Sequence, residues 1–516
     1  MGNIAPVTPP PKDELAVERW LMAMVWIHVA SMLAMPLVLA RFLPGGGIDD
    51  PLERVRLIAE HPWLFRLGWL PWQLTALVDF IFAVALVRAR YLPKALTVPT
   101  LVMTLAAIAP DQYAQAMYVT KGVELAQTSA AAFLAWEPFI FQLTAGWGAT
   151  GYTLGTLVML AAFRSGRVWS VALTRATLVF CVAMIPAAVA PLLPAGLRPP
   201  PSVVVVLNAL GFSVLLLLYA VLLEAVLRRR IADEVHGRWA PWRLPGAGLF
   251  ARAVDWVAGS RFFYALLEPV PVFAMASDIT DVVYVNYLVD AERLAPLVPR
   301  GLELQRLGPR GDKAVFTFLT YRHGNFGFRF LGPLRRLSPS AVQTNWRIHV
   351  REPRSGLEGI FFVTNAIDHV AQALGARLFS EGMPMHVLER TLLARDGDGI
   401  ELALHPGSGS APDAKLSLRR GERALPPEWR ECFDSFDAML AYVVPQNRAL
   451  STQPYKGRVT RQEIHLPIEL AECVPLDGTV ESRAARAFVG DAKPLCFHVP
   501  NVSFLFSEER HDSRLR

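Results

Sequence analysis

The sequence is poor in cysteine, and its cysteines follow no recognisable pattern. Only Cys181, Cys432, Cys473 and Cys496 occur, and no two of them form a CxxC pair. We therefore expect neither a disulfide framework nor a zinc centre, and the chain is compatible with a reducing compartment. The N-terminal stretch MGNIAPVTPPPKDE lacks the basic region of a cleavable signal peptide, so none is expected. No basic patch interleaved with aromatic residues is present, which argues against a nucleic-acid partner.

Charge is also scarce and unevenly placed. Charged residues make up 19% of the 516 residues and hydrophobic ones 53%, with a mean hydropathy of +0.32. This composition is too apolar for a wholly soluble protein. Residues 1–230 carry 17 Lys and Arg against 12 Asp and Glu, whereas the remainder carries 34 against 33. The basic excess thus lies in the apolar part, where loop arginines orient membrane helices.

Long apolar runs fill the first part of the chain. A membrane-spanning helix needs about 20 predominantly apolar residues. Six segments meet or approach this length, the third being short: Trp20–Ala40, Leu67–Val87, Ala95–Ala109, Phe139–Phe163, Val171–Leu193 and Ser202–Leu227. In the fourth, Gly151 and Gly155 form a small-xxx-small pair that allows close helix approach, within the chain or between copies.

Basic residues follow alternate spans and predict the topology. They lie after the second, fourth and sixth spans: Arg88, Arg90, Lys94, Arg164, Arg167, Arg228, Arg229 and Arg230. The first loop is mixed in charge and disagrees mildly. The positive-inside rule then places both termini and the C-terminal domain in the cytoplasm, in a multi-pass protein of the cell membrane.

Two polar residues lie deep within the apolar spans. His28 and Asp79 are both about 12 Å from the cytoplasmic helix ends at 1.5 Å per residue. An intramembrane carboxylate is costly and is usually paired, so we expect these two side chains to face one another. One interpretation is a structural hydrogen bond between neighbouring helices, and the other is part of a proton or ion path.

The segment after the last span is rich in aromatic residues and arginine. Residues 231–270 include Trp239, Trp242 and Trp256, with Arg243 and Arg252 nearby. Such residues suit the headgroup level of a bilayer. The segment either holds the following domain against the membrane or packs on that domain. The predicted organisation is a cytoplasmic tail (1–19), a transmembrane domain (20–230), a juxtamembrane linker (231–270), a soluble domain (271–507) and a C-terminal tail (508–516).

From about residue 271 the hydrophobic period changes to two, which indicates strands. Strands are predicted over 281–289, 314–322, 341–350, 357–364, 385–394, 400–405 and 414–419, with one helix over 367–379. Asp290 is expected to cap a short helix that ends near Pro299. The predicted fold class is therefore an all-α polytopic membrane helix bundle followed by an α+β, mainly antiparallel β-barrel or cone domain.

Four segments of this domain carry a resemblance. VNYLVDAERLAPLVPRGLEL, AVQTNWRIHV, GIFFVTNA and GARLFSEGMPMH resemble the acetoacetate decarboxylase-like superfamily, in particular its uncharacterised branch. The resemblance covers about residues 271–507. That branch commonly has Glu-x-Asn-x-Arg-x-Tyr-Val in the second segment. This chain keeps Asn345 and Arg347 but has Gln343 and His349 at the outer positions, so roles of the glutamate and tyrosine are not inherited.

The resemblance also implies a difference in chemistry. The decarboxylases use a Schiff-base lysine in a Gly-Phe-Pro-Lys-Lys segment, where this chain has Gly382-Met383-Pro384-Met385-His386. A Schiff-base lysine needs a lowered pKa. The lysines of the domain, Lys313, Lys415, Lys456 and Lys493, mostly lie beside turns or polar residues. We therefore expect no Schiff-base decarboxylation.

One strand concentrates polar side chains. Alternation over Val342–Val350 places Gln343, Asn345, Arg347 and His349 on one face. This face is either solvated or the wall of a ligand-binding interior, which is where the similar enzymes bind substrate. Arg377 and His386 are expected to reach the same space.

Three classes of function follow. The favoured one is a membrane-tethered domain that binds a small organic acid or acyl compound, with Gln343, Asn345, Arg347, His349 and Arg377 as ligand-binding residues. The second is an enzyme in which Arg347 holds a carboxylate and His386 transfers a proton. The third is a transporter or channel that uses the Asp79 region. His323, His369 and His405 are too scattered for a metal site, and neither a metal nor a cofactor is predicted. The oligomeric state does not follow from the sequence.

Overall fold

The computed structural model describes residues 12–164, 171–227, 239–260, 263, 267, 270–380, 382–444, 447–453, 458–499 and 501–512. The chain divides into two compact units, Met1–Arg230 and Ile231–Arg516. Of the residues used above to predict topology and chemistry, Arg167, Arg228–Arg230 and Lys456 lie outside the described residues.

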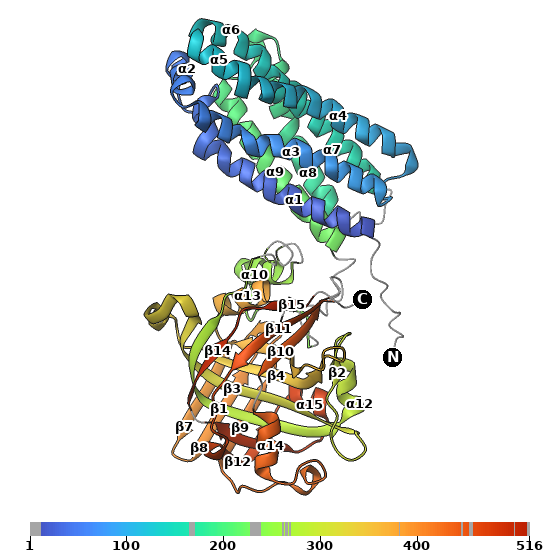
Figure 1. Cartoon of the computed structure of the whole chain (residues 1–516), viewed down its shortest axis with the longest axis vertical. Helices are drawn as coiled ribbons and strands as arrows, with labels where there is room; N and C mark the ends of the chain where they lie inside the picture. The colour runs from blue at the N-terminus through green and yellow to red at the C-terminus, as the bar shows by residue number, and fades with distance from the viewer. Residues whose placement is uncertain are drawn as a thin grey trace. The chain divides into compact units, whose positions relative to one another are not determined.

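The first unit is entirely helical in its described part (Figure 1). Its α-helices are α1 (Lys12–Ala34), α2 (Pro51–Glu60), α3 (Pro62–Arg88), α4 (Lys94–Met117), α5 (Val123–Thr128), α6 (Ala130–Phe141), α7 (Ala149–Arg164), α8 (Val171–Val189) and α9 (Pro201–Leu227). Short π and 3-10 turns connect several of them, including the π-helical η4 (Gln142–Gly148) between α6 and α7.

Four described helices, rather than six, are long and apolar enough to cross a membrane: Ala16–Phe42, Pro62–Arg88, Val171–Leu192 and Ser202–Glu224. The third and fourth predicted spans are also helical, but neither is among these long apolar helices. α4 carries Pro110, Asp111 and Gln115 in its last third. The fourth is divided among α6, η4 and α7. The third predicted span, which ends at Ala109, thus covers only the apolar part of α4.

Two kinds of residue support close helix contacts within this unit: small residues, and polar residues that form pairs. A Cβ added at Gly151 of α7 would lie 2.7 Å from Cα of Ala107 in α4, so this glycine lets two helices meet within the chain. At the α2–α6 contact, Arg54 is 4% exposed and Glu137 also 4%. Both guanidinium nitrogens of Arg54 donate to the Glu137 carboxylate, Nη1 to Oε1 at 2.6 Å. The buried charge is thus paired in a bidentate geometry.

The second unit is built on one large, mainly antiparallel sheet. Its strands are β1 (Met275–Asp290), β2 (Glu303–Leu304), β3 (Lys313–Phe328), β4 (Val342–Arg351), β5 (Glu358–Ile367), β6 (Met385–Val387), β7 (Arg390–Asp396), β8 (Gly399–His405), β9 (Ala414–Arg420), β10 (Arg448–Gln453), β11 (Arg458–His465), β12 (Val474–Glu481), β13 (Pro494–Val499), β14 (Val502–Phe506) and β15 (Arg510–Asp512). The order β14-β11-β10-β5-β4-β3-β1 closes on itself because β14 also pairs with β1.

β1 reaches this closure by changing partners halfway. Residues Met275–Ile279 pair with β14 and Val282–Tyr287 pair with β13. Asp281 lies between the two sections with a φ of 53°, next to a register shift between Thr280 and Val283. This irregularity bends the strand, as a β-bulge does. A second group of strands, β12-β9-β8-β7, extends from β13.

The predicted fold class is confirmed. Six of the seven predicted strands correspond to β1, β3, β4, β5, β8 and β9, whereas the single strand predicted over 385–394 is divided into β6 and β7. The helix predicted over 367–379 is α13 (Val370–Phe379). The short helix predicted after Asp290 is α12 (Ala291–Leu294), and Asp290 occupies its N-cap position, but its side chain makes no cap hydrogen bond. Instead, its Oδ1 accepts a hydrogen bond of 2.8 Å from Lys313 Nζ across the β1–β3 pair. The Asp290 carboxylate thus pairs with a nearby lysine instead of capping the helix.

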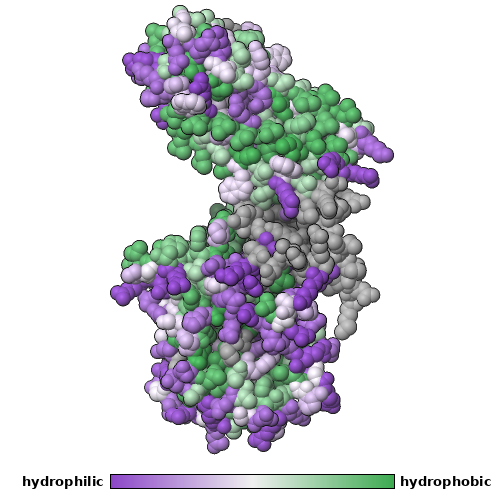
Figure 2. Space-filling view, in the orientation of Figure 1, coloured by the Kyte–Doolittle hydropathy of each residue, from purple (hydrophilic) through white to green (hydrophobic). Residues whose placement is uncertain are grey.

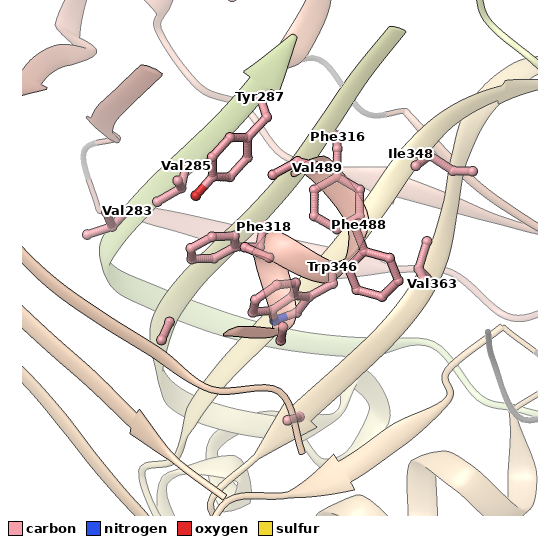
Figure 3. Close-up of a cluster of buried hydrophobic side chains, with 14 of the residues drawn as sticks. Val283, Val285, Tyr287, Phe316, Phe318, Trp346, Ile348, Val363, Phe488 and Val489 are labelled. Carbon is pink, nitrogen blue, oxygen red and sulfur yellow. The ribbon is translucent and has the colours of Figure 1, made fainter. Parts of the chain in front are cut away.

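The largest apolar core of the domain lies against one face of β1, β3 and β4 (Figure 3). Trp346 is fully buried and stacks on Phe318 with ring centroids 4.4 Å apart. Phe488 of α15 (Arg483–Val489) packs beside Trp346 and Phe316. Full burial of such side chains contributes about 1.5–3 kcal/mol each. The opposite face of β4 therefore carries the polar residues.

Helices lie at both ends of the sheet. Figure 1 shows α14 (Phe436–Val443) at one end of the domain, and α10 (Leu249–Gly259) with α13 at the other. Ala251 and Val254 of α10 are buried in a cluster with Ala373 of α13. Trp239 Nε1 donates to Ser410 O at 2.8 Å. The described part of segment 239–260 thus packs on the domain.

Candidate functional site

The polar face of β4 is buried, so it is not a solvated strand surface. Gln343 is 3% exposed, Asn345 7%, Arg347 3% and His349 4%. They alternate with Trp346 and its apolar neighbours, as the sequence predicts. Buried polar groups cost free energy unless hydrogen-bonded. The partners of each side chain therefore decide what it can do.

Gln343 and Asn345 belong to a chain of hydrogen bonds. Ser277 Oγ lies 2.8 Å from His323 Nδ1, and His323 Nε2 lies 2.8 Å from Gln343 Oε1. Gln343 Nε2 donates to Asn345 Oδ1 at 2.7 Å, and Asn345 Nδ2 donates to Tyr321 OH at 3.1 Å. Since Gln343 Oε1 only accepts, His323 is assigned as the Nε2–H tautomer that accepts from Ser277. Burial lowers the pKa of His323 to about 4, which keeps it neutral. Buried polar groups whose hydrogen bonds are satisfied in this way make the sheet more rigid.

Arg347 is different because no carboxylate in the described part of the chain pairs with it. Its Nη2 donates to Val443 O at 3.4 Å, and its guanidinium lies over the Tyr284 ring, 5.3 Å from the centroid. Among the described residues, Nε has no hydrogen-bond partner and no acidic side chain forms an ion pair with it. Asp368, on the adjoining strand end, instead accepts from Val342 N and Thr391 Oγ1. The arginine charge is buried and uncompensated.

His349 lies next along the polar face. Its ring stacks on Tyr442 of α14 with centroids 4.5 Å apart, and its Nε2 is buried without a partner in the described part of the chain. Burial, and secondarily the Arg347 charge, lowers the pKa of His349 to about 3. A neutral imidazole beside a fixed cation offers a hydrogen-bonding atom without a second positive charge.

Tyr442 also lines an open groove of about 760 Å³ on the outside of the domain. The groove is bordered by residues 295–307, Arg351 and Glu358. One side of Tyr442 thus faces the groove, and its ring covers His349. This tyrosine lies between a solvent-accessible hollow and the buried pair Arg347 and His349.

Arg377 and His386 form a second cluster rather than joining Arg347. Arg377 Nε donates to Ala258 O at 3.0 Å and its guanidinium lies over the Trp242 ring. His386 stacks on the same indole and its Nδ1 lies 2.8 Å from Ser410 Oγ. Burial lowers the pKa of Arg377 to about 9, and burial with the Arg377 charge lowers that of His386 well below its usual value.

The register of β6 explains the separation. Met385 pairs with Asn365 and His386 pairs with Ala366 of β5. Since Asn365 is paired with Asn345 on the polar face, Met385 takes that side and His386 the other. Met385 and His386 thus place one apolar and one neutral side chain on opposite faces of β6.

None of the described lysines lies in an apolar pocket. Lys415 and Lys493 are exposed. Lys313 is partly exposed, and its hydrogen bond to Asp290 raises its pKa. A raised pKa keeps the amine protonated and is the opposite of what imine formation needs.

In the helical unit, His28 Nε2 lies 4.0 Å from Asp79 Oδ1, and His28 Nδ1 bonds Met24 O at 2.8 Å. Asp79 borders a small cavity of about 40 Å³ together with Tyr152 and Tyr219. Nearby, Asp111 accepts hydrogen bonds from Thr144, Gln115 and Tyr152. The sequence interpretation did not include Asp111, although it is a carboxylate inside a helix.

Three residues of the C-terminal site were missed from the sequence. Asn365 pairs with Asn345 and has an unpartnered buried Oδ1 within the described residues. Tyr284 lies under Arg347, and Tyr442 covers His349. Asn365 is a polar residue ending an apolar strand, a weak signal. The two tyrosines read as ordinary apolar core, and only the pairing of distant segments reveals them.

The C-terminal part of the chain is similar to known proteins. Residues 277–466 match the DUF2071 family model, described as an uncharacterized conserved protein. No curated protein sequence matches the chain. One similar solved structure is an acetoacetate decarboxylase from Legionella pneumophila, 14% identical with a TM-score of 0.33, covering 47% of this chain and 88% of that chain.

Two further structures have similar values. The enduracididine biosynthesis enzyme MppR in complex with pyruvate is 14% identical, with a TM-score of 0.32, covering 47% of this chain and 91% of that chain. An acetoacetate decarboxylase-like enzyme from Sphingomonas wittichii is 12% identical, with a TM-score of 0.32, covering 47% of this chain and 94% of that chain. The C-terminal half therefore contains a DUF2071 domain, and its structural neighbours are acetoacetate decarboxylase-like proteins.

Proposed function

We propose that the C-terminal domain binds a small organic acid or acyl compound through Arg347, without Schiff-base decarboxylation, and that the helical unit holds this domain at a membrane. The observation that carries the proposal is the buried, uncompensated guanidinium of Arg347. A buried charge normally has a partner, because its removal from water is expensive. A carboxylate fits the planar fork of arginine in two places.

The surroundings of Arg347 support a small ligand with one anionic end. Nε is free in the described residues, and Nη2 makes only a long contact of 3.4 Å to Val443 O. His349 Nε2 and Asn365 Oδ1 add unpartnered polar atoms to the same face of the sheet. The ligand reaches the site from the groove beside Tyr442, after that ring moves off His349.

The experiment compares two arginines of one strand. Thermal unfolding of the full chain in detergent is measured with a panel of monocarboxylates, including acetoacetate and pyruvate, and with the matching neutral amides. We expect a carboxylate, but not its amide, to stabilise the protein. Arg347→Met should weaken binding about tenfold to a hundredfold, since a charge-assisted hydrogen bond contributes about 1.5–3 kcal/mol.

Arg351→Met is the matched control. Arg351 is on the same strand, but its side chain is half exposed and paired with Glu303 at 2.9 Å. This variant should keep the carboxylate response. If both variants respond like the parent chain, or if no carboxylate stabilises the parent, the proposed ligand class is wrong.

The membrane part of the proposal has its own test. We propose a multi-pass protein of the cell membrane with both termini and the DUF2071 domain in the cytoplasm, because arginine-rich loops follow alternate apolar helices. A reporter fused after Arg516 should read cytoplasmic, and one in the loop after the first candidate span, near Gly47, external. Finding both on one side of the membrane would exclude this topology.

A further inference from the structure

One end of the C-terminal domain exposes an unusual number of large apolar side chains. α10 buries Ala251, Val254 and Ala258 on one face. Its other side exposes Leu249 by 84%, Phe250 by 70% and Trp256 by 55%. A surface helix normally carries polar residues on its outer side. Apolar residues on both sides indicate that something apolar also covers the outside.

A second segment, distant in sequence from α10, also exposes large apolar side chains. The helical turns Arg329–Leu337, called η9, expose Phe330, Leu331, Leu334 and Leu337. Phe273 and Phe328 extend the same surface, because Phe273 packs edge-on against both Phe328 and Phe330. None of these side chains is needed to fill the core.

Contacts through α13 place the two segments at the same end of the domain. Arg377 Nε of α13 donates to Ala258 O at the end of α10, and Gln372 Nε2 of α13 donates to Ser338 Oγ just after η9. In Figure 1, the yellow helical turns of η9 lie beside α10 and α13, at the end away from α14. Figure 2 shows apolar surface at this end, with hydrophilic residues beside it.

The charge of this surface has one sign along η9. The chain contains no Asp or Glu between Lys313 and Arg351, whereas η9 itself carries Arg329, Arg335 and Arg336. Arg329, Arg336 and, on α10, Arg252 are exposed, and none of the three forms an ion pair in the described part of the chain. Exposed aromatic and aliphatic side chains rimmed by unpaired arginines are typical of a surface that meets anionic headgroups.

We propose that this end of the domain, formed by α10, η9 and Phe273, inserts apolar side chains into the headgroup layer of an anionic lipid bilayer. The chain favours this occupant over a protein partner. The start of α10 follows the last candidate span by about 25 residues, a tether that reaches at most roughly 90 Å. So short a tether keeps the domain at a high effective concentration near the bilayer.

The test uses the full chain reconstituted into vesicles of phosphatidylcholine with phosphatidylglycerol. A fluorophore is attached at Leu337→Cys, with Cys181 and Cys432 replaced by Ser. The control is Asp434→Cys in the same background, an exposed position next to α14 at the other end of the domain. Lipids with a nitroxide near the headgroup should quench the probe at 337 at least threefold more than the probe at 434.

A second variant tests the charges. Arg329→Gln with Arg336→Gln should lower the quenching at 337 about twofold in anionic vesicles and leave it unchanged in pure phosphatidylcholine. Equal quenching at 337 and 434 overturns the proposal. Quenching at 337 that appears only at high protein density, with energy transfer between labelled copies, also overturns it and assigns the surface to a second copy of the chain. The carboxylate response of Arg347 is independent of each of these outcomes.

Discussion

Two arginines, one in each unit, are equally buried but differently compensated. Arg54 in the helical unit is 4% exposed and lies in a bidentate pair with Glu137. Arg347 in the DUF2071 domain is 3% exposed and, among the described residues, has a carbonyl and an aromatic ring beside it but no carboxylate. The first charge is satisfied within the fold, so it is a structural element. Under the proposed function, the second is satisfied when an anionic ligand binds.

Removing the carboxylate partner of Arg54 should cause the largest loss of stability. Glu137→Gln leaves Arg54 buried without its carboxylate, and loss of one partner of a buried pair costs about 3–5 kcal/mol. Hydrogen exchange of α2 and α6 in the detergent-solubilised full chain should report this loss. The control is Glu60→Gln, which removes an exposed i,i+4 pair with Arg56 and should cost less than about 0.5 kcal/mol.

The hydrogen-bond chain through Gln343 and Asn345 should contribute the next largest stabilisation. Gln343→Leu removes the middle of the hydrogen-bond chain and leaves His323 Nε2 and Asn345 Oδ1 without their partner. Each buried group left unsatisfied costs about 1–3 kcal/mol. Hydrogen exchange should accelerate in β3 and β4. Exchange rates unchanged from those of the parent chain would mean that the chain of hydrogen bonds adds nothing to stability.

A pH dependence follows from the buried histidines. Burial lowers the pKa of His323 to about 4 and of His349 to about 3, against about 6.5 when unfolded. Because the unfolded chain takes up these protons first, the stabilisation is complete above pH 6.5 and is lost as the pH falls below it. At pH 5 the loss is about 2 kcal/mol for each histidine.

His349→Gln is the variant that isolates one contribution. Between pH 7 and pH 5, the local unfolding free energy of β4 from hydrogen exchange should fall less steeply in this variant than in the parent chain. An identical slope in both proteins would show that His349 is protonated in the fold and that its surroundings are more polar than the burial indicates.

The smallest change in stability is expected when Arg347 is replaced in the unliganded domain. Arg347→Met removes an uncompensated charge and keeps apolar bulk, so the stability of the unliganded domain should change by less than about 1 kcal/mol or rise. Arg54→Met is the direct comparison, because it leaves Glu137 buried and should destabilise by several kcal/mol. A large loss in Arg347→Met would mean that Arg347, too, is a structural residue.

The sequence by itself determined the division of the chain and most of its strands. Apolar runs of about 20 residues and period-two alternation are local properties, and they identified the helical unit, β1 and β3–β9. The sequence prediction counted six long apolar helices instead of four, because it accepted a third segment that is shorter than a membrane span and a fourth that contains polar residues and glycines such as Gln142, Thr144 and Gly146. The segments that became β10–β15 lack clear alternation and were not predicted.

Only the tertiary structure decided what the polar residues do. Alternation placed Gln343, Asn345, Arg347 and His349 on one face, but whether water or protein covers that face depends on α14 and β3, which come from other parts of the chain. The same holds for His386, which one residue of register in β6 directs away from Arg347. A strand fixes which side chains share a face, whereas pairing and packing between distant segments determine which charges remain unpaired. The missing carboxylate at Arg347 is a property of that packing.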